Sequence, residues 1–310
     1  MNDAGSADPR RLEAERVLYQ GQLEEAAALF QAAADAGDAA AALRSAVFAA
    51  EGFGRPHDWS AAIELLARAA ELGSQDAQRQ IALLLGSTSA AGTWRDKLAV
   101  LDLQALLTPP PLERKSELSM VGIARGFAPE RFCAWLIERS SDRVQPAYVQ
   151  VAGTGERRIS TKRTAHSCGI GPQNRDFIVS VLQERAARLT GLPLSNQEQP
   201  NVITYEPGQH FEAHYDFTAA NLMHMREFVR SGQRVMTLVT YLNDDFTGAP
   251  TRFPKLELDL RGGVGDAVVF SNVNPDGSPD ENTLHAGMPP EAGRKWVLSQ
   301  WIRERPQRLR

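Results

Sequence analysis

The chain has 310 residues, of which 43% are hydrophobic and 23% are charged, a globular composition that excludes long disordered and collagen-like segments. Its 34 basic and 38 acidic residues give a net charge of −4, so we expect no nucleic-acid partner. No apolar run reaches the ~18 residues of a membrane span, so we expect no membrane partner either.

Residues 10–107 are rich in Ala, Leu and Glu and follow the helical period. Two segments, which begin at Leu23 and Trp59, repeat with an offset of 36 residues, and each runs through paired alanines to a glycine, Gly37 or Gly73. Small residues let paired helices approach closely, and glycine ends a helix in the left-handed conformation. The pattern predicts a short helix–turn–helix array and resembles Sel1-like repeats, relatives of the tetratricopeptide repeat. An unrelated Ala-rich bundle is the alternative.

Three successive prolines, Pro109 to Pro111, interrupt the helical pattern, because proline cannot continue a helix and favours extended backbone. We therefore end the helical domain (10–107) here and interpret residues 108–119 as a Pro-rich linker. Its second half, from Leu112 onward, is charged and is expected to be a linker or a short helix.

Residues 120–305 are expected to form a second domain with its own core, since the chain is long enough for two. A strand is predicted near Met120, a helix after Pro129, and a second helix that ends at Gly191. Short strand-like runs follow at 200–206, 209–217, 234–242, 255–260, 266–271 and 294–302. Many short strands after two helices predict a jelly roll supported by helices on one side.

The sequence His214-Tyr215-Asp216 suggests a metal site on one of these strands. Side chains two residues apart lie on the same face of a strand, so both could reach one metal ion. His285, on a later segment, would supply a third ligand. Two histidines and one carboxylate form the facial triad of non-haem Fe(II) oxygenases, whereas zinc, the competing metal, prefers a tetrahedral site. The pattern alone is weak, and a surface histidine followed by an aspartate-containing turn would also explain it.

The last strand-like run alternates in polarity, so that Lys295, Val297, Ser299 and Trp301 share one face. A lysine on an inward face is unusual, because a buried ammonium group needs a partner. A cosubstrate that carries a carboxylate would provide that partner. The alternative is an edge strand whose lysine faces water.

Six ordered segments of the second domain resemble motifs of the prolyl 4-hydroxylases. They are residues 205–216 (Y-x-x-G-Q-x-Y-x-x-H-x-D), 234–243 (R-x-x-T-x-x-x-Y-L-N), 248–254, 265–270, 285–289 and 293–296. Residues 185–198 also resemble the helix and loop before that family's first core strand. The resemblance covers about residues 120–305 and implies a double-stranded β-helix enzyme. It also implies the cofactors Fe(II), 2-oxoglutarate and O2, with ascorbate as an optional addition.

The resemblance implies roles for eight residues. Three match the family's iron ligands: His214, Asp216 and His285. Three match residues that contact the cosubstrate, with Lys295 on its far carboxylate: Lys295, Tyr205 and Tyr241. Two match positions in the substrate groove: Arg234 and Trp301. There are two departures, because Phe211 replaces a substrate-side tyrosine and Ala249 replaces a glycine.

The resemblance implies hydroxylation of a prolyl residue in a peptide or protein, with release of succinate and CO2. Because Phe211 lacks the tyrosine hydroxyl, the alternatives are another residue, a free amino acid or a small molecule. A repeat adaptor with an inactive barrel is a third alternative, which an intact triad disfavours. The helical repeats would dock the peptide on a concave surface, or would serve only as a packing partner.

Two observations indicate where the protein resides. The first residues carry no apolar run of the kind found in signal peptides. The two cysteines, Cys133 and Cys168, are too few for a disulfide framework and are expected to be free thiols. We therefore expect a cytoplasmic protein.

Overall fold

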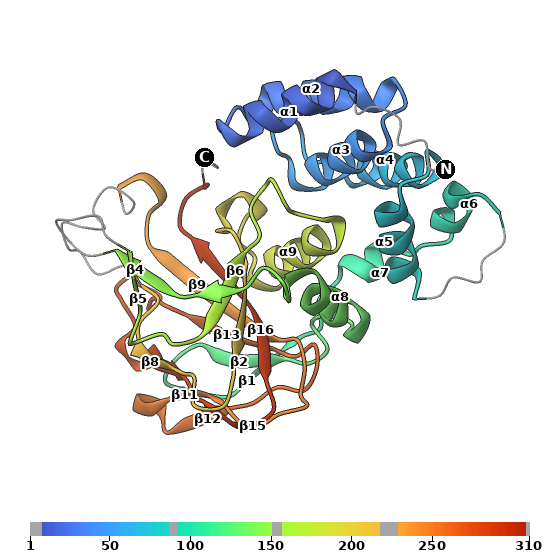
Figure 1. Ribbon diagram of the computed structural model, residues 1–310. Coiled ribbons are helices and arrows are strands. Elements are labelled where there is room, and N and C mark those ends of the chain that lie inside the picture. The colour runs from blue at the N-terminus through green and yellow to red at the C-terminus, as the bar shows by residue number, and fades with distance from the viewer. Residues whose placement is uncertain (1–7, 87–91, 151–156, 218–228, 308–310) are drawn as a thin grey trace. The chain divides into compact units, whose positions relative to one another are not determined.

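The computed structural model describes residues 8–86, 92–150, 157–217 and 229–307 (Figure 1). Two compact units form: Met1–Thr108 with Gly171–Arg185 and Arg308–Arg310, and Pro109–Ile170 with Ala186–Gln307. Gly171–Arg185, which the sequence assigned to the second domain, thus clusters with the helical unit. Within the described ranges, no helix combines the length and the apolar character needed to cross a bilayer.

The first unit is helical (Figure 1). Its described helices before the linker are α1 (Pro9–Tyr19), α2 (Leu23–Asp35), α3 (Ala39–Glu51), α4 (Trp59–Glu71), α5 (Gln75–Leu85), α6 (Trp94–Ala99) and α7 (Leu103–Leu107). The pair α2–α3 recurs as α4–α5 with both helices displaced by 36 residues, which confirms the predicted helix–turn–helix period. Gly37 and Gly73 follow α2 and α4 at φ of +97° and +95°. Asp38 and Ser74 then cap the next helices with their side chains.

Gly171–Arg185 is held by side chains of these helices. The guanidinium group of Arg175 forms an ion pair with Glu51 at 3.0 Å, and both side chains are almost fully buried. Gln80 accepts a hydrogen bond from the backbone N–H of Phe177 at 2.8 Å, at the start of α9 (Phe177–Thr190). Arg44 donates to the carbonyl of Arg175 at 2.9 Å. Only the last turn of α9 belongs to the second unit, and the helix ends before Gly191 as predicted.

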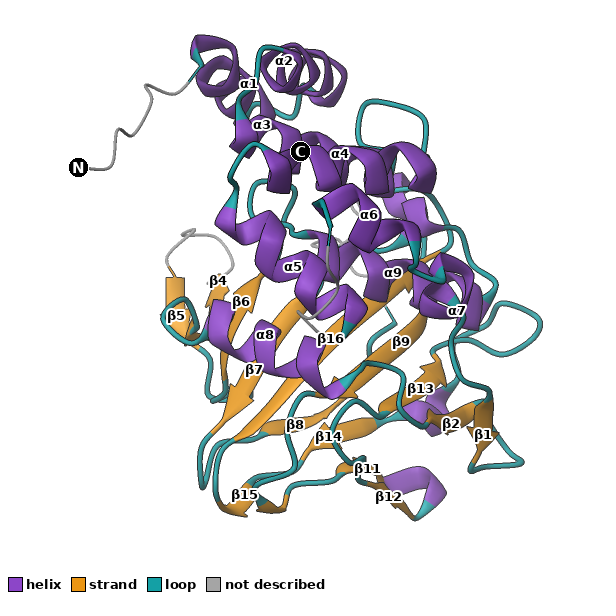
Figure 2. Cartoon of the chain, turned by 90° about the vertical axis from the view of Figure 1, so that its right-hand side faces the viewer, coloured by secondary structure: helices purple, strands orange, loops and turns teal. Residues whose placement is uncertain are grey.

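The second unit contains two main antiparallel sheets (Figure 2). Among the described residues the larger has the order β1 (Leu112–Arg114), β2 (Val121–Ala124), β13 (Ala267–Ser271), β9 (Arg234–Tyr241), β16 (Lys295–Arg303), β7 (Asn201–Tyr205), β6 (His166–Gly169) and β3 (Gln145–Pro146). The smaller has the order β12 (Leu258–Leu260), β11 (Thr251–Phe253), β14 (His285–Gly287) and β8 (Phe211–His214). Both sheets contribute to one apolar core, which is consistent with the predicted jelly roll.

Smaller elements complete this unit. They are α8 (Glu130–Ser140), the pairs β4 (Tyr148–Gln150) with β5 (Arg157–Ile159) and β10 (Thr247–Gly248) with β15 (Pro290–Ala292), and the 3₁₀ turns η1 (Leu194–Asn196), η2 (Pro254–Leu256) and η3 (Glu281–Thr283). The helix α8 contacts the larger sheet, where the Cys133 thiol lies 3.9 Å from the carbonyl oxygen of Tyr241. This is the supporting helix that the sequence predicted after Pro129.

The structure corrects three local expectations. The segment from Leu112 is the edge strand β1 and not a helix, because the prolines before it keep the chain extended and its backbone pairs with β2. The run 255–260 is a strand only in its second half, β12, and its first two residues belong to the 3₁₀ turn η2. The strand β8 ends at His214, so Asp216 lies beyond it. Asp216 therefore reaches the metal site from the turn after β8, and not because it shares one face of a strand with His214.

Candidate active site

One pocket opens between the two sheets, with a volume of about 450 Å³ that includes its open mouth. It brings together six of the eight residues singled out in the sequence: His214, Asp216, His285, Lys295, Tyr205 and Trp301. These residues come from four strands and one turn that lie far apart in the sequence. The whole inward face of β16 expected from the sequence lines the same pocket.

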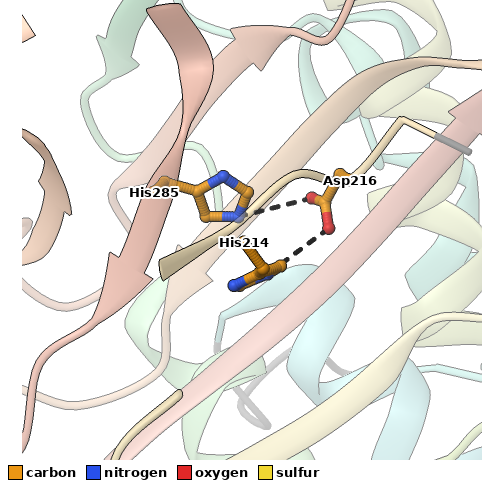
Figure 3. Close-up of side chains that lie close together, drawn as sticks. All are labelled: His214, Asp216 and His285. Atoms are coloured by element: carbon orange, nitrogen blue, oxygen red, sulfur yellow. Dashed lines mark ion pairs between the residues drawn. The ribbon is translucent and has the colours of Figure 1, made fainter. Parts of the chain in front are cut away.

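His214, Asp216 and His285 form a compact cluster (Figure 3). One ligand atom from each residue lies within 4.8 Å of the other two. The Nε2 atoms of His214 and His285 both point to the Asp216 carboxylate, at 3.6 Å from Oδ1 and 3.6 Å from Oδ2. The pairing of β14 with β8 places the two histidines directly opposite each other. One ion could therefore contact two nitrogens and one oxygen.

Backbone carbonyls fix the orientation of both imidazole rings. Nδ1 of His214 donates to the carbonyl oxygen of Glu212 at 2.8 Å, and Nδ1 of His285 donates to that of Thr283 at 3.0 Å. With the proton on Nδ1, Nε2 presents a lone pair to the centre of the cluster. This is the tautomer that a metal ligand needs, so the donor set fits a divalent transition metal.

Burial and charge set the protonation of the cluster. Burial lowers the pKa of His285 to about 4, although the Asp216 carboxylate opposes this shift. Burial by itself would raise the pKa of Asp216, but the adjacent His285 and His214 hold it well below its usual range. At neutral pH the histidine is therefore neutral and the carboxylate is ionised, as metal binding requires.

Lys295 is the first residue of β16 and is 1% exposed. Its Nζ donates to the carbonyl oxygen of Ala249 at 2.8 Å and lies 4.8 Å and 5.4 Å from the ring centroids of Tyr241 and Tyr205. Burial, together with the charge of Arg261, lowers the pKa of Lys295 to about 7. No carboxylate in the part of the chain that the structure describes forms an ion pair with it. The lysine faces inward, so the edge-strand alternative is wrong.

The two tyrosines expected at the cosubstrate differ in their surroundings. Tyr205 lies opposite Lys295 in the β7–β16 register and lines the pocket. Tyr241 lies behind the pocket, and its hydroxyl donates to the carbonyl oxygen of Leu260 at 3.0 Å and accepts the backbone N–H of Thr251 at 3.1 Å. Burial raises the pKa of Tyr241 to about 12. Thr251, which belongs to the motif at residues 248–254 but received no role from the sequence, lines the pocket instead of Tyr241.

Arg234 and Trp301 contact each other at one side of the pocket. The Arg234 guanidinium lies 4.4 Å from the Trp301 ring centroid and makes two hydrogen bonds to the Glu198 carboxylate, at 2.6 and 2.8 Å. The buried Arg303 also donates to Glu198, at 2.6 Å. Only Trp301 lines the pocket. No local signal in the sequence points to Glu198 and Arg303, because their pairing joins segments that are distant in the chain.

The two departures from the family pattern lie next to these groups. The Phe211 ring stacks on the imidazole of His214, with centroids 3.6 Å apart and planes 17° apart. Ala249 has a positive φ of 53°, a conformation that glycine adopts without strain. Its carbonyl is nevertheless the one that contacts Lys295. Neither substitution changes the three clustered ligand atoms.

The chain is similar to several prolyl 4-hydroxylases. It is 29% identical over 217 residues to a protein of Arabidopsis thaliana named probable prolyl 4-hydroxylase 4, with coverage of 63% of this chain and 71% of the relative. It is 35% identical over 130 residues to a putative prolyl 4-hydroxylase of Acanthamoeba polyphaga mimivirus, with coverage of 41% and 54%. The 2-oxoglutarate complex of a viral collagen prolyl hydroxylase from Paramecium Bursaria Chlorella virus-1 aligns at 24% identity with a TM-score of 0.46, and covers 59% of this chain and 95% of that one.

A comparison with protein-family models matches the part of the chain that contains the pocket. Residues 200–303 match the family model described as the 2OG-Fe(II) oxygenase superfamily. The matched segment spans β7 to the end of β16 and includes all the pocket residues discussed above. Residues 200–303 are therefore similar to 2OG-Fe(II) oxygenases, with prolyl 4-hydroxylases among the relatives of the chain, and the cofactors of the pocket are Fe(II), 2-oxoglutarate and O2.

Proposed function

We propose that this protein hydroxylates a prolyl residue in a peptide or protein and releases succinate and CO2. The observation that carries the proposal is one pocket in which a cluster of two histidines and a carboxylate lies next to a buried lysine that has no acidic partner among the described residues. The cluster fits Fe(II), and the lysine fits the anionic end of 2-oxoglutarate. The names of the relatives support proline as the target.

In this proposal His214, Asp216 and His285 hold Fe(II), which together with 2-oxoglutarate and O2 supplies the oxidising power for C–H hydroxylation. Lys295 pairs with the far carboxylate of the cosubstrate, and Tyr205 lies next to that pair. Tyr241 holds Thr251 in the pocket wall and covers Lys295 with its ring. The protein thus orients the cosubstrate between two fixed points and excludes water from its charged end.

Arg234 and Trp301 are proposed to form the wall against which the substrate lies. Glu198 holds the Arg234 guanidinium against the indole ring, so the wall is rigid before substrate binds. A second candidate function is hydroxylation of another residue or of a small molecule. Phe211 favours it, because this side chain has no hydroxyl to offer the substrate and stacks on His214 instead.

Product analysis separates these candidates. The purified chain is incubated with Fe(II), 2-oxoglutarate, ascorbate and peptides from a lysate, and mass spectrometry locates each added oxygen atom. We expect oxygen on proline with the native chain, and neither hydroxylation nor succinate release with His285→Ala. Oxygen on another residue would support the second candidate. Equal succinate release from His285→Ala and the native chain would exclude the iron site proposed here.

We infer that the helical unit is a Sel1-like array, on the basis of its 36-residue period and its paired alanines before each glycine. Side chains of α3 and α5 hold Gly171–Arg185 of the same chain, so we propose that this face of the array serves as an internal support. Docking of substrate by the array would then use another of its surfaces. Docking predicts a lower KM for a long substrate than for a short peptide with the same target residue. Equal KM values would leave support as the role.

We also propose that the protein acts in the cytoplasm. Cys133 and Cys168 are both buried and unbridged, as expected in a reducing compartment. Imaging of the full chain fused to a fluorescent protein, with cell fractionation as a second measurement, tests this proposal. Recovery in a secreted or membrane fraction would contradict it.

A further inference from the structure

Two polar side chains behind the pocket form a hydrogen-bonded chain to Asp216. Thr237 lies on β9, is 1% exposed, and has its hydroxyl oxygen 2.8 Å from Asp216 Oδ2. The Nδ2 atom of Asn272, directly after β13, lies 2.9 Å from the same hydroxyl oxygen. Thr237 is the threonine of the motif at residues 234–243, but the sequence assigned no role to it or to Asn272, and neither residue lines the pocket.

The direction of each hydrogen bond follows from the number of protons available. An ionised carboxylate can only accept, so the single proton of the Thr237 hydroxyl must go to Asp216. The hydroxyl oxygen then has only lone pairs left for Asn272, so the amide must turn its NH2 group toward Thr237. In this orientation Oδ1 of Asn272 is buried without a hydrogen-bond partner in the described structure. The chain of donation runs from Asn272 to Thr237 to Asp216.

The backbone of Asn272 reaches a second member of the cluster. Its carbonyl oxygen accepts the N–H of Asp280 at 3.0 Å. The carbonyl of Asp280 in turn accepts both the N–H and the hydroxyl of Thr283, at 3.2 and 2.8 Å. The carbonyl of Thr283 receives the Nδ1 proton of His285. Asn272 is therefore connected to Asp216 through its side chain and to His285 through its backbone.

We propose that Thr237 and Asn272 are positioning residues of the metal centre, which fix Asp216 and His285 in one arrangement before the metal binds. The inference rests on the iron site proposed above. The hydroxyl of Thr237 donates to Oδ2 of Asp216, so the carboxylate would present itself to the metal in one orientation. It also restrains rotation of the carboxylate, because Asp216 is buried and water cannot readily replace this bond.

Metal binding by the full chain tests the proposal without turnover. The variants are Thr237→Val, which keeps the shape and removes the hydroxyl, and Thr237→Ser, which restores it. The matched control is Thr204→Val on β7, because Thr204 is similarly buried and its hydroxyl makes no hydrogen bond in the described structure. Calorimetry measures Co(II) affinity, and the visible spectrum of the bound ion reports its ligand arrangement. The melting temperature of the metal-free protein reports stability separately.

We expect Thr237→Val to bind Co(II) about 10–100-fold more weakly than the native chain, as is usual when a group that orients a metal ligand is lost. Thr237→Ser should recover most of this affinity and the native spectrum, and Thr204→Val should match the native chain in both. Asn272→Leu should show a smaller loss than Thr237→Val, because the Thr237 proton can still reach Asp216.

Equal affinities for Thr237→Val and Thr204→Val would overturn the proposal, even if both variants lose the same stability. If Thr237→Val does not fold, Asn272→Leu is compared with the native chain instead. Native Co(II) affinity in Asn272→Leu would then overturn the proposal. Absence of Co(II) and Fe(II) binding by the native chain would instead contradict the metal site itself. The failure of this inference is thus distinguishable from the failure of the proposed function.

Discussion

Lys295 lies at the first position of β16, which is hydrogen-bonded to β7 on one side and to β9 on the other. Its ammonium group has one carbonyl and two tyrosine rings as neighbours and no described acidic partner. A buried cation without a counter-ion is costly, and burial accordingly lowers its pKa to about 7. A ligand carboxylate at this point would supply the missing charge.

Substitution of Lys295 tests this role. In Lys295→Ala the far carboxylate of 2-oxoglutarate would be buried without a partner, at a cost of about 3–5 kcal/mol. This corresponds to a half-saturation concentration about 10²–10³-fold higher. A titration of succinate release measures it, and calorimetry with Co(II) shows whether metal affinity is retained. Half-saturation at the native concentration would mean that another basic residue holds the cosubstrate.

The lowered pKa of Lys295 also predicts a dependence on pH. Above about pH 7 the unliganded lysine loses its proton, so affinity for the dianionic cosubstrate should fall by up to tenfold per pH unit. Over the same window the unliganded fold becomes more stable, because the unfolded lysine retains a proton that the folded one has released. Lys295→Arg keeps its charge at these pH values and should bind independently of pH. An equal decline in both proteins would assign the effect to another group.

The start of β16 is set by a turn that only glycine fits. Gly293 joins β15 to β16 with a φ of +77°, and a Cβ atom there would lie 2.3 Å from the carbonyl oxygen of Asp245. The strand begins two residues later at Lys295, so the turn determines where the ammonium group lies. The turn at Gly293 and the position of Lys295 are thus coupled through the backbone.

Gly293→Ala and Gly277→Ala separate steric clash from backbone strain. Gly277 has a similar φ of +84°, but a methyl group added there would have no other atom within 4 Å, so this variant should lose only about 1–2 kcal/mol of unfolding free energy. Gly293→Ala adds a clash with backbone atoms and should lose more, and it should also raise the half-saturation for 2-oxoglutarate. Urea denaturation gives the first quantity and succinate release the second. Equal losses of unfolding free energy in the two variants would show that the turn at Gly293 accommodates the methyl group without moving β16.

At the scale of the whole chain, the two compact units share the helix α9. Its first residues, including Phe177 and Ile178, belong to the helical unit and are fully buried, whereas its last turn belongs to the second unit. Trp59 of α4 contacts the Phe177 ring edge-to-face at 5.5 Å. The domain boundaries expected at 10–107, 108–119 and 120–305 remain a prediction, but Gly171–Arg185 does not follow them.

Deletion of residues 1–107 tests whether the second domain can stand alone. The sequence led us to expect that it would, because it carries its own core. The structure leads to the opposite expectation, because the deletion removes the partners of Arg175 and exposes buried apolar side chains of α9. Burial of each such side chain contributes about 1.5–3 kcal/mol to the free energy of unfolding. The truncated chain should aggregate on size-exclusion chromatography and melt at a lower temperature. A monomeric truncated chain with native succinate release would show that the second domain folds by itself, as the sequence led us to expect.

Local sequence patterns were enough to predict the repeated helices, several core strands and six residues of the pocket. The 36-residue period predicted α2 to α5, and alternation along residues 294–302 predicted the inward face of β16 that holds Lys295. The histidines were identified because the chemistry of a metal site restricts the residue types. These features are local, since each depends on neighbours in the chain or on the identity of a few side chains.

The other features depend on tertiary structure. It placed Asp216 in a turn beyond β8, joined the hydroxyl of Tyr241 to Thr251 and Leu260, and paired Glu198 with Arg234 and Arg303. It also joined Thr237 and Asn272 to the metal cluster and put Gly171–Arg185 into the helical unit. These features depend on strand register and on burial against segments that are distant in the chain. No local sequence pattern specifies either of these.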